Sequence, residues 1–216
     1  MNKKHILFAA VMAAISFPAV AGPGVDVHIS TLGYGADVAF QVSDTVVARV
    51  GLNQFKKSIN SSSNGLNYTG DLKLSSFGLL ADWHLFNGVT HLTAGLMGNG
   101  NKLSMMATAA ANTNYTINGA TYNSGPTGGT LTAAVDFNKT APYFGFGWSG
   151  QPKNSGFSFN SDFGIMFQGS PKATVTATGW SGASSALTSD AQTQLDDDLK
   201  NYKYYPVISI GIGYAF

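Results

Sequence analysis

The residues of this chain that could do chemistry are acidic, basic and imidazole side chains placed at alternate positions between apolar ones. Alternation with a period of two indicates β-strands whose two faces differ in polarity. Polar faces of neighbouring strands would meet in one interior, where each charge must be paired or wetted. The residues that we expect there are Asp26, His28, Asp37, Arg49, Asn53, Asp82, His84, His91, Asp136 and Asp162.

Arg49 is the residue around which this chemistry would be organised, because the chain contains no other Arg. The sequence also lacks Glu, so every acidic side chain is Asp. A guanidinium that faces carboxylates forms strong and often bidentate hydrogen bonds. We therefore predict that Arg49 bridges to Asp37 or Asp82.

The last stretch of the sequence indicates which elements position these side chains. One alternate row, from Ile208 to Phe216, is large and apolar, whereas the row from Val207 to Ala215 is small and uncharged. A strand of a soluble sheet would carry charge on its second face. Small residues instead fit a tight lumen filled by side chains, with lipid outside. With low charge and sustained alternation elsewhere, this predicts an all-β fold, a transmembrane antiparallel up-and-down β-barrel.

Short and long connections alternate along the predicted strands. Bacterial barrels place short turns in the periplasm and long loops outside. The short connections are expected at 43–45, 86–88 and 151–156, and the long ones at 60–69, 106–130 and 179–202. Within the last loop, Ser189 to Leu199 has the pattern of a short helix. A change of phase at 75–76 predicts a bulge, which would also turn Asp71 and Lys73 inward.

The number of strands depends on the first segment of the mature chain. The apolar row changes phase between Ile29 and Leu32, which indicates a bulge or a tight reversal. Without a reversal the chain has seven strands. Single-chain bacterial barrels have even numbers, so we predict eight, with Gly24–Ser30 as a separate first strand that reverses near Thr31–Gly33.

Large aromatic residues gather at the end of the barrel with short turns. Aromatic girdles mark the interfaces between a membrane and water. The girdle that we expect consists of Phe40, Trp83, Trp148, Phe157, Tyr214 and Phe216.

The N-terminus has the features of a secretory signal peptide. Lys3 and Lys4 precede an apolar run from Ile6 to Phe17, and Ala19-Val20-Ala21 forms a small-residue cleavage site. We expect residues 1–21 to be cleaved and residues 22–216 to form one barrel domain in the cell outer membrane. The absence of Cys excludes a disulfide framework. A nearly neutral mature chain implies no nucleic acid partner.

Two functions and one less supported activity follow from these features. In the first, the barrel is a narrow channel for small solutes, and the Asp residues that line it favour cations. Alternatively it is closed by an Arg49–Asp network and apolar side chains, and its outer loops serve structure, adhesion or host contact. A lipid-modifying enzyme using Ser76, Asp82, His84 and His91 is weakly supported, because such sites are recognised by geometry. We assign no catalytic residue, cofactor or metal site, and Asp196-Asp197-Asp198 is expected to be a solvated acidic face.

Four segments resemble the family of small outer-membrane barrels that includes the CarO-type proteins and, more distantly, OmpW-like barrels. The segments are Thr31 to Ala36, Ala141 to Gly147, Gly169 to Lys172, and Tyr205 to Phe216. The resemblance implies an eight-stranded barrel and, for CarO-type members, proposed uptake of small molecules such as basic amino acids. The expected partners are outer-membrane lipid and lipopolysaccharide, and the barrel-assembly machinery, which would bind the C-terminal strand ending at Phe216. We expect a monomer.

Overall fold

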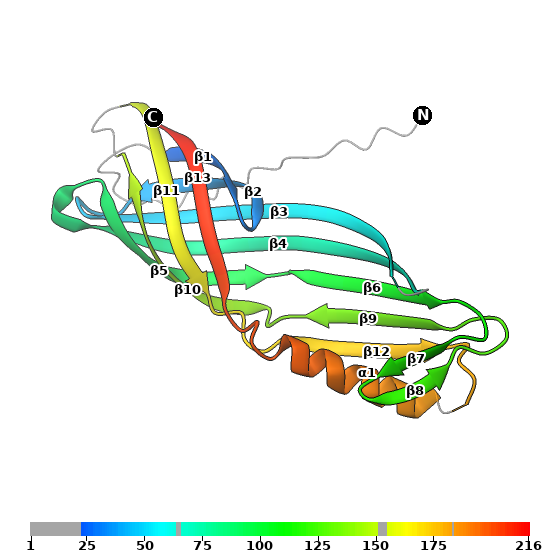
Figure 1. The fold of residues 1–216 in the computed structure, drawn as a ribbon. Coiled ribbons are helices and arrows are strands. Elements are labelled where there is room, and N and C mark those ends of the chain that lie inside the picture. The colour runs from blue at the N-terminus through cyan, green and yellow to red at the C-terminus, as the bar shows by residue number, and fades with distance from the viewer. Residues whose placement is uncertain (1–22, 64–65, 151–154, 183) are drawn as a thin grey trace, which may run out of the picture.

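The computed structural model describes residues 23–63, 66–150, 155–182 and 184–216, and in this part of the chain eight antiparallel strands close a ring (Figure 1). The last of these strands pairs with the first, so the ring has no free edge around its circumference. In order around the ring they are β1 (Gly24–Ser30), β2 (Gly33–Gln41), β3 (Val46–Ser63), β4 (Leu66–His84), β5 (Thr90–Asn99), β10 (Thr140–Ser149), β11 (Gly156–Met166) and β13 (Tyr205–Ala215). The predicted eight-stranded β-barrel is confirmed.

The first strand is separate, as predicted. β1 pairs with β13 on one side and with β2 on the other, and the chain reverses through Thr31 and Leu32. Gly33 follows the reversal with a φ of +108°, a conformation that suits glycine. The reversal carries the Leu32 side chain into the ring, where it is 1% exposed.

Part of the barrel wall continues beyond the ring. β4 pairs with β5 over Ser76–His84 and with β6 over Leu66–Lys73. The continuation, which we call the outer sheet, has the strand order β12-β9-β6-β4-β3 (Figure 1). Its further strands are β6 (Lys102–Ala109), β9 (Thr130–Asp136) and β12 (Lys172–Thr178). We call this the extended end of the molecule, and the opposite end, where the strand connections are short, the short-turn end.

The bulge predicted at 75–76 is wrong, because β4 runs without interruption from Leu66 to His84. The pattern changes because the surroundings of the two faces change. In the ring, outward residues such as Leu79 and Trp83 are apolar and exposed. In the outer sheet the inward face carries Leu72, whereas Lys73 is exposed on the outward face. The prediction that Asp71 and Lys73 face inward is therefore also wrong.

Three of the predicted connections have different forms in the structure. The polar segment at 60–69 belongs to the β3–β4 hairpin, and the segment at 106–130 contains the end of β6 and a second hairpin, β7 (Asn114–Ile117) with β8 (Ala120–Asn123). The turn after β4 places Phe86 and Asn87 at positive φ, within the 3₁₀ helix η1 (Leu85–Asn87). The short turn at 43–45 lies between β2 and β3 as predicted. Residues 1–21 and most of the turn at 151–156 lie outside the described residues.

Helix α1 (Ser184–Leu199) begins earlier than predicted and lies along β12 (Figure 1). Gln192 forms the link: its Oε1 accepts a hydrogen bond from the Val175 amide at 3.0 Å, and its Nε2 donates to the Ala173 carbonyl at 2.9 Å. One side-chain amide thus satisfies the free edge of β12 as a further strand would. No helix in the described part of the chain is both long and apolar enough to cross a membrane.

Replacing Gln192 with Ala should loosen α1 from the outer sheet without disturbing the ring. The loss of both hydrogen bonds is expected to lower the local opening free energy by about 1–3 kcal/mol. Hydrogen exchange of residues 184–199 measures this directly. Thr193→Ala is the matched control, since the Thr193 hydroxyl bonds only within the helix, to the Ser189 carbonyl. Equal exchange in the two variants would contradict the assigned role of Gln192.

Candidate functional site

Arg49 lies in the middle of the barrel lumen and joins opposite walls. From β3 it contacts Asp82 on β4 with Nε–Oδ2 and Nη2–Oδ1 distances of 2.6 and 3.0 Å. It also donates from Nη1 and Nη2 to the two carboxylate oxygens of Asp162 on β11, both at 3.0 Å. Asp37 on β2 lies 3.6 Å from Nη1. The guanidinium therefore binds Asp162 through two hydrogen bonds, and Asp82 through one hydrogen bond and an ion-pair contact of Nε.

The partners of Arg49 are only partly those predicted from the sequence. Asp82 binds the guanidinium as predicted, and Asp37 lies at the edge of its reach. Asp162 was expected in the lumen but not as a partner of Arg49, since 113 residues separate the two in the chain. Thr93 adds a hydrogen bond from its hydroxyl to Asp82 Oδ1 at 2.7 Å. The network is thus supported by side chains from β2, β3, β4, β5 and β11.

A Ser–His–Asp sequence of contacts also lies in the lumen, and Ser149, its first member, was not predicted. His91 Nε2 is 3.1 Å from Asp162 Oδ1, and its Nδ1 is 3.2 Å from Ser149 Oγ. Acyl transfer also needs donors aimed at a developing oxyanion. The amides of Ser149 and Gly150 instead donate to the carbonyls of Val89 and Phe159, and Asp162 is neutralised by Arg49. The four residues named for lipid hydrolysis do not form a triad either: His84 Nδ1 bonds the Gly88 carbonyl.

Apolar side chains close the lumen between this network and the extended end. Leu32 enters from the β1–β2 reversal and packs in one buried cluster with residues of four other strands. We call this cluster the lumen plug; it consists of Leu32, Met97, Ala141, Tyr143, Met166 and Val207. Its members are at most 6% exposed, as is typical of a closely packed interior.

Two cavities lie along the lumen, on either side of the Arg49 network. The larger, of about 130 Å³, opens at the short-turn end and is lined by Asp26, Asp37 and His84, among others. The smaller, of about 40 Å³, lies between Arg49 and the lumen plug and includes Tyr143. The Arg49 network therefore lies between two cavities of the lumen.

The structure brings together most of the predicted lumen residues and separates one from them. Lining the two cavities are Asp37, Arg49, Asp82, His84, His91 and Asp162. Asp136 is a correction: its carboxylate is 52% exposed and pairs with Lys102 Nζ at 2.8 Å on the outer sheet. The sequence pattern joined β9 and β10 into one strand, but residues 137–139 separate them. Asp136 consequently belongs to the outward face of a different sheet region.

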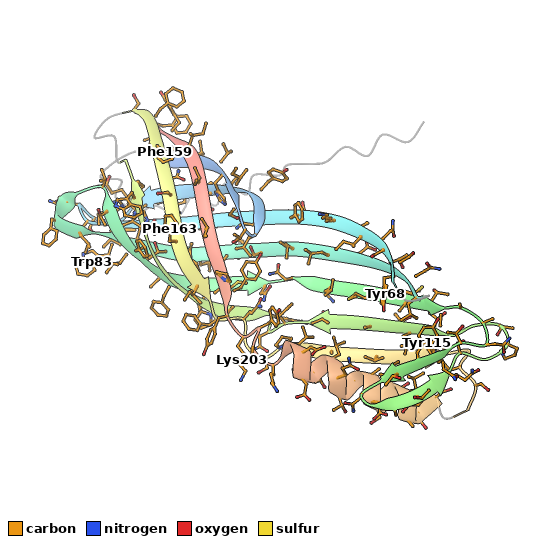
Figure 2. The ribbon with its side chains drawn as sticks, in the orientation of Figure 1. Tyr68, Trp83, Tyr115, Phe159, Phe163 and Lys203 are labelled. Atoms are coloured by element: carbon orange, nitrogen blue, oxygen red, sulfur yellow. The ribbon has the colours of Figure 1, made fainter. Side chains whose placement is uncertain are left out.

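The aromatic residues predicted to form a girdle all lie on strand ends or termini at the short-turn end. Figure 2 shows Trp83 at this end, far from Tyr68 and Tyr115. Trp83 is 55% exposed, and the ring of Tyr214 lies 5.1 Å from the rings of both Phe157 and Phe216. Phe40 on β2 and Trp148 on β10 are also exposed, on opposite sides of the ring. Their contact with a membrane interface stays a prediction.

The extended end contains a separate apolar cavity of about 540 Å³ between the outer sheet, the β7–β8 hairpin and α1. Tyr68, Met105 and Leu195 contribute to its apolar lining, and Asp198 lies at its edge. Beside it, Tyr115 and Trp180 pack edge to face with ring centres 5.7 Å apart. Its polar lining residues are Asn114, Thr116, Gln194 and Asp198. A mostly apolar lining with some polar groups is typical of ligand pockets.

Two polar side chains of α1 position the hairpin over this cavity. Gln194 Oε1 accepts a hydrogen bond from the Asn118 amide at 3.0 Å. The Tyr122 hydroxyl donates to Asp190 at 2.5 Å, which raises the pKa of the Tyr122 phenol because the carboxylate disfavours the phenolate. The cavity is therefore lined in part by segments that the sequence pattern assigned to three separate loops, at 60–69, 106–130 and 179–202.

Comparison with known proteins identifies the architecture. No protein-family model and no curated protein matches the chain. Among solved structures, CarO2 of Acinetobacter baumannii has a TM-score of 0.62 at 22% sequence identity, covering 91% of this chain and 99% of CarO2. CarO of the same organism has a TM-score of 0.59 at 22% identity, covering 89% of this chain and 97% of CarO. The chain has the fold of the CarO proteins.

The resemblance to CarO-type barrels predicted from the sequence is thus confirmed at the level of the fold. The coverage of nearly the full length of both CarO structures means that the ring and the outer sheet belong to the shared architecture. At 22% identity the likeness extends to no particular residue of the lumen.

Proposed function

We propose that this protein is an outer-membrane β-barrel that is closed to solutes and that acts through its outer sheet and α1 at the cell surface. The CarO-like fold and the apolar outer wall of the ring support location in the outer membrane. Residues 1–21 would serve as the export signal, and the strand ending at Phe216 as the segment that the barrel-assembly machinery binds. Lipid and lipopolysaccharide would surround a monomeric ring.

The observation that carries this proposal is the double closure of the lumen. Arg49 is held by Asp82 and Asp162 from opposite walls. Beyond it, Leu32 and the rest of the lumen plug fill the barrel. A solute would have to separate a desolvated ion pair and then displace packed apolar side chains. Both steps oppose conduction, because interiors are closely packed and buried ion pairs are costly to break.

The part of the chain left to carry a function is the extended end. A sheet that served only to span the bilayer would end near the rim of the ring. Here β3 and β4 run on past the ring, and they support a helix, a hairpin and an apolar cavity. Their exposed face is rich in Ser, Thr, Asn and Lys, which suits a surface in water. We assign to this unit a structural or adhesive role through contact with molecules outside the cell.

Single-channel recording in a planar bilayer tests the closed lumen. The refolded mature protein should produce no conductance steps, while a general porin recorded in the same bilayer should. Heat-modifiable gel mobility would show that the silent protein is folded. Discrete steps from the folded protein would contradict the proposal.

The second candidate, a narrow cation channel, is favoured by one observation. The cavity at the short-turn end is lined by Asp26 and Asp37 and would attract cations. If conductance is found, Asp82→Asn tells the two functions apart. In a cation channel this change alters the preference for cations, because it removes a lumen charge, whereas leakage through a damaged barrel is not selective.

A further inference from the structure

A second group of side chains in the lumen, apart from the ion pairs of Arg49 with Asp82 and Asp162, has the composition of a metal site. Asp26 and His28 lie on β1, and Asp37 lies on β2 directly opposite Asp26. Their ligand atoms all lie within 4.8 Å of one another. We propose that these three residues bind one divalent transition-metal ion, such as Zn²⁺, which reaches them through the cavity at the short-turn end.

The distances suit a small ion with imidazole and carboxylate ligands. His28 Nδ1 is 3.0 Å from Asp26 Oδ1 and 3.7 Å from Asp37 Oδ2. Ligands of a tetrahedral Zn²⁺ with bonds of about 2.0–2.1 Å lie about 3.3 Å apart. The three groups therefore need only small side-chain adjustments to share an ion. A water molecule would fill the fourth position from the cavity.

Asn53 fixes the imidazole of His28 in the orientation that a metal ligand requires. Asn53 Oδ1, an acceptor, lies 2.9 Å from His28 Nε2, so Nε2 carries a proton. Nδ1 faces the carboxylates of Asp26 and Asp37, and a metal ion would displace the proton that Nδ1 shares with them. A second-shell hydrogen bond of this kind is typical of metal-binding histidines.

The charge balance of the lumen favours a bound cation. Among the described residues of the two lumen cavities, four carboxylates oppose the guanidinium of Arg49 and the imidazole of His28, which pairs with Asp26 and Asp37. The four carboxylates are those of Asp26, Asp37, Asp82 and Asp162. Arg49 is engaged by Asp82 and Asp162. The Asp37 side chain is about 10% exposed, and in the described structure it forms no hydrogen bond, only ion pairs at 3.6 and 3.7 Å. Excess buried carboxylate is costly unless a cation or a proton compensates it.

Glycines on the neighbouring strands make the space that the site occupies. A Cβ atom at Gly35 would overlap the His28 ring and lie 2.6 Å from Asn53 Oδ1, and one at Gly51 would overlap the Asp37 carboxylate. At Gly211 it would lie 2.7 Å from His28 Cβ. Glycine inside a strand often marks the close approach of another group. Asp26 and Asp37 also line the cavity that opens at the short-turn end, which supplies an entry path.

Titration calorimetry with Zn²⁺ on the refolded, untagged mature protein tests the site. We expect one equivalent of Zn²⁺ to bind. His28→Ala should abolish that binding, and Asn53→Ala should weaken it about 10–100-fold. His84→Ala is the matched control, because His84 lines the same cavity but bonds the Gly88 carbonyl rather than a carboxylate. It should bind Zn²⁺ as the wild-type protein does.

The proposal is overturned if the folded wild-type protein binds no Zn²⁺, or if His28→Ala binds it equally well. Equal binding would show that the ion is held elsewhere on the protein, for example on the exposed Asp196-Asp197-Asp198 face. If the His28 variant does not refold, X-ray absorption of the Zn²⁺-loaded wild-type protein decides the question. A first shell with one imidazole nitrogen and carboxylate oxygens supports the site, and a shell of oxygen alone refutes it. Neither result depends on whether the barrel conducts.

Discussion

Replacing Arg49 with Met is expected to lower the free energy of unfolding by about 3–5 kcal/mol. The change removes one guanidinium and leaves Asp82 and Asp162, both less than 10% exposed, without their cation. Two carboxylates close together in a poorly solvated site also repel each other. Methionine roughly keeps the length of the side chain, so the measured loss would reflect charge rather than a cavity. Urea unfolding of the refolded protein in detergent or lipid vesicles measures the difference.

Two further variants show whether the loss arises from buried charge. Lys56→Met makes the same kind of change at an exposed position of the same strand and should alter the stability by less than about 0.5 kcal/mol. Arg49→Met combined with Asp82→Asn and Asp162→Asn should recover much of the lost stability, because no unpaired carboxylate is then left. If the free energy of unfolding of Arg49→Met alone lay within about 1 kcal/mol of wild type, Arg49 would not be central to the network.

The second large effect is expected for Gly33→Ala, at the reversal between β1 and β2. The φ of +108° at Gly33 is unfavourable for alanine, at about 1–3 kcal/mol. The new Cβ would also overlap the Gln54 carbonyl oxygen and lie 2.6 Å from Phe55 Cβ. Because backbone cannot move aside cheaply, overpacking adds about 1–3 kcal/mol. We expect a total loss of about 2–6 kcal/mol, with displacement of Leu32 from the lumen plug.

A second variant, Gly119→Ala, separates the cost of the backbone conformation at Gly33 from the cost of the steric overlap. Gly119 has a φ of +80°, but nothing lies within 4 Å of a Cβ atom there. Only the conformational penalty applies, so this variant should lose about 1–3 kcal/mol. Equilibrium unfolding of both variants, each compared with wild type, gives the contribution of the clash. If Gly33→Ala were no worse than Gly119→Ala, the β1–β2 reversal would have room that the structure does not provide.

Alternation in the sequence was sufficient for the ring because a barrel strand has a strict period of two. The inward positions of the ring strands, such as Asp26 on β1 and Asp162 on β11, follow from this period. The same rule explains why Gly24–Ser30 could be recognised as a separate strand from its change of phase. Charge gives a second criterion for the inward face, because Arg49 and its carboxylates cannot face an apolar environment.

The rule was misleading where strands pass out of the ring. At 75–76 the apolar residues change from one face of β4 to the other, although the strand continues without a bulge. The cause is that the outward face passes from apolar to polar surroundings. A sequence pattern records only the polarity of a face, so a change of solvent and a bulge look alike. Asp136 was assigned to the lumen, although β9 lies in the outer sheet. The polar end of the β3–β4 hairpin was likewise expected to be a loop.

By itself the sequence determined the class of fold, the number of ring strands and the set of polar side chains that share an interior. These are local properties, set by periodicity and by the cost of exposing charge to an apolar environment. Only the tertiary structure decided that Arg49 binds Asp162, 113 residues away, and that Leu32 closes the lumen. It also decided that Asp26, His28 and Asp37 converge. These contacts depend on which strands become neighbours across a closed ring and on the exact stagger between them, which no local pattern contains.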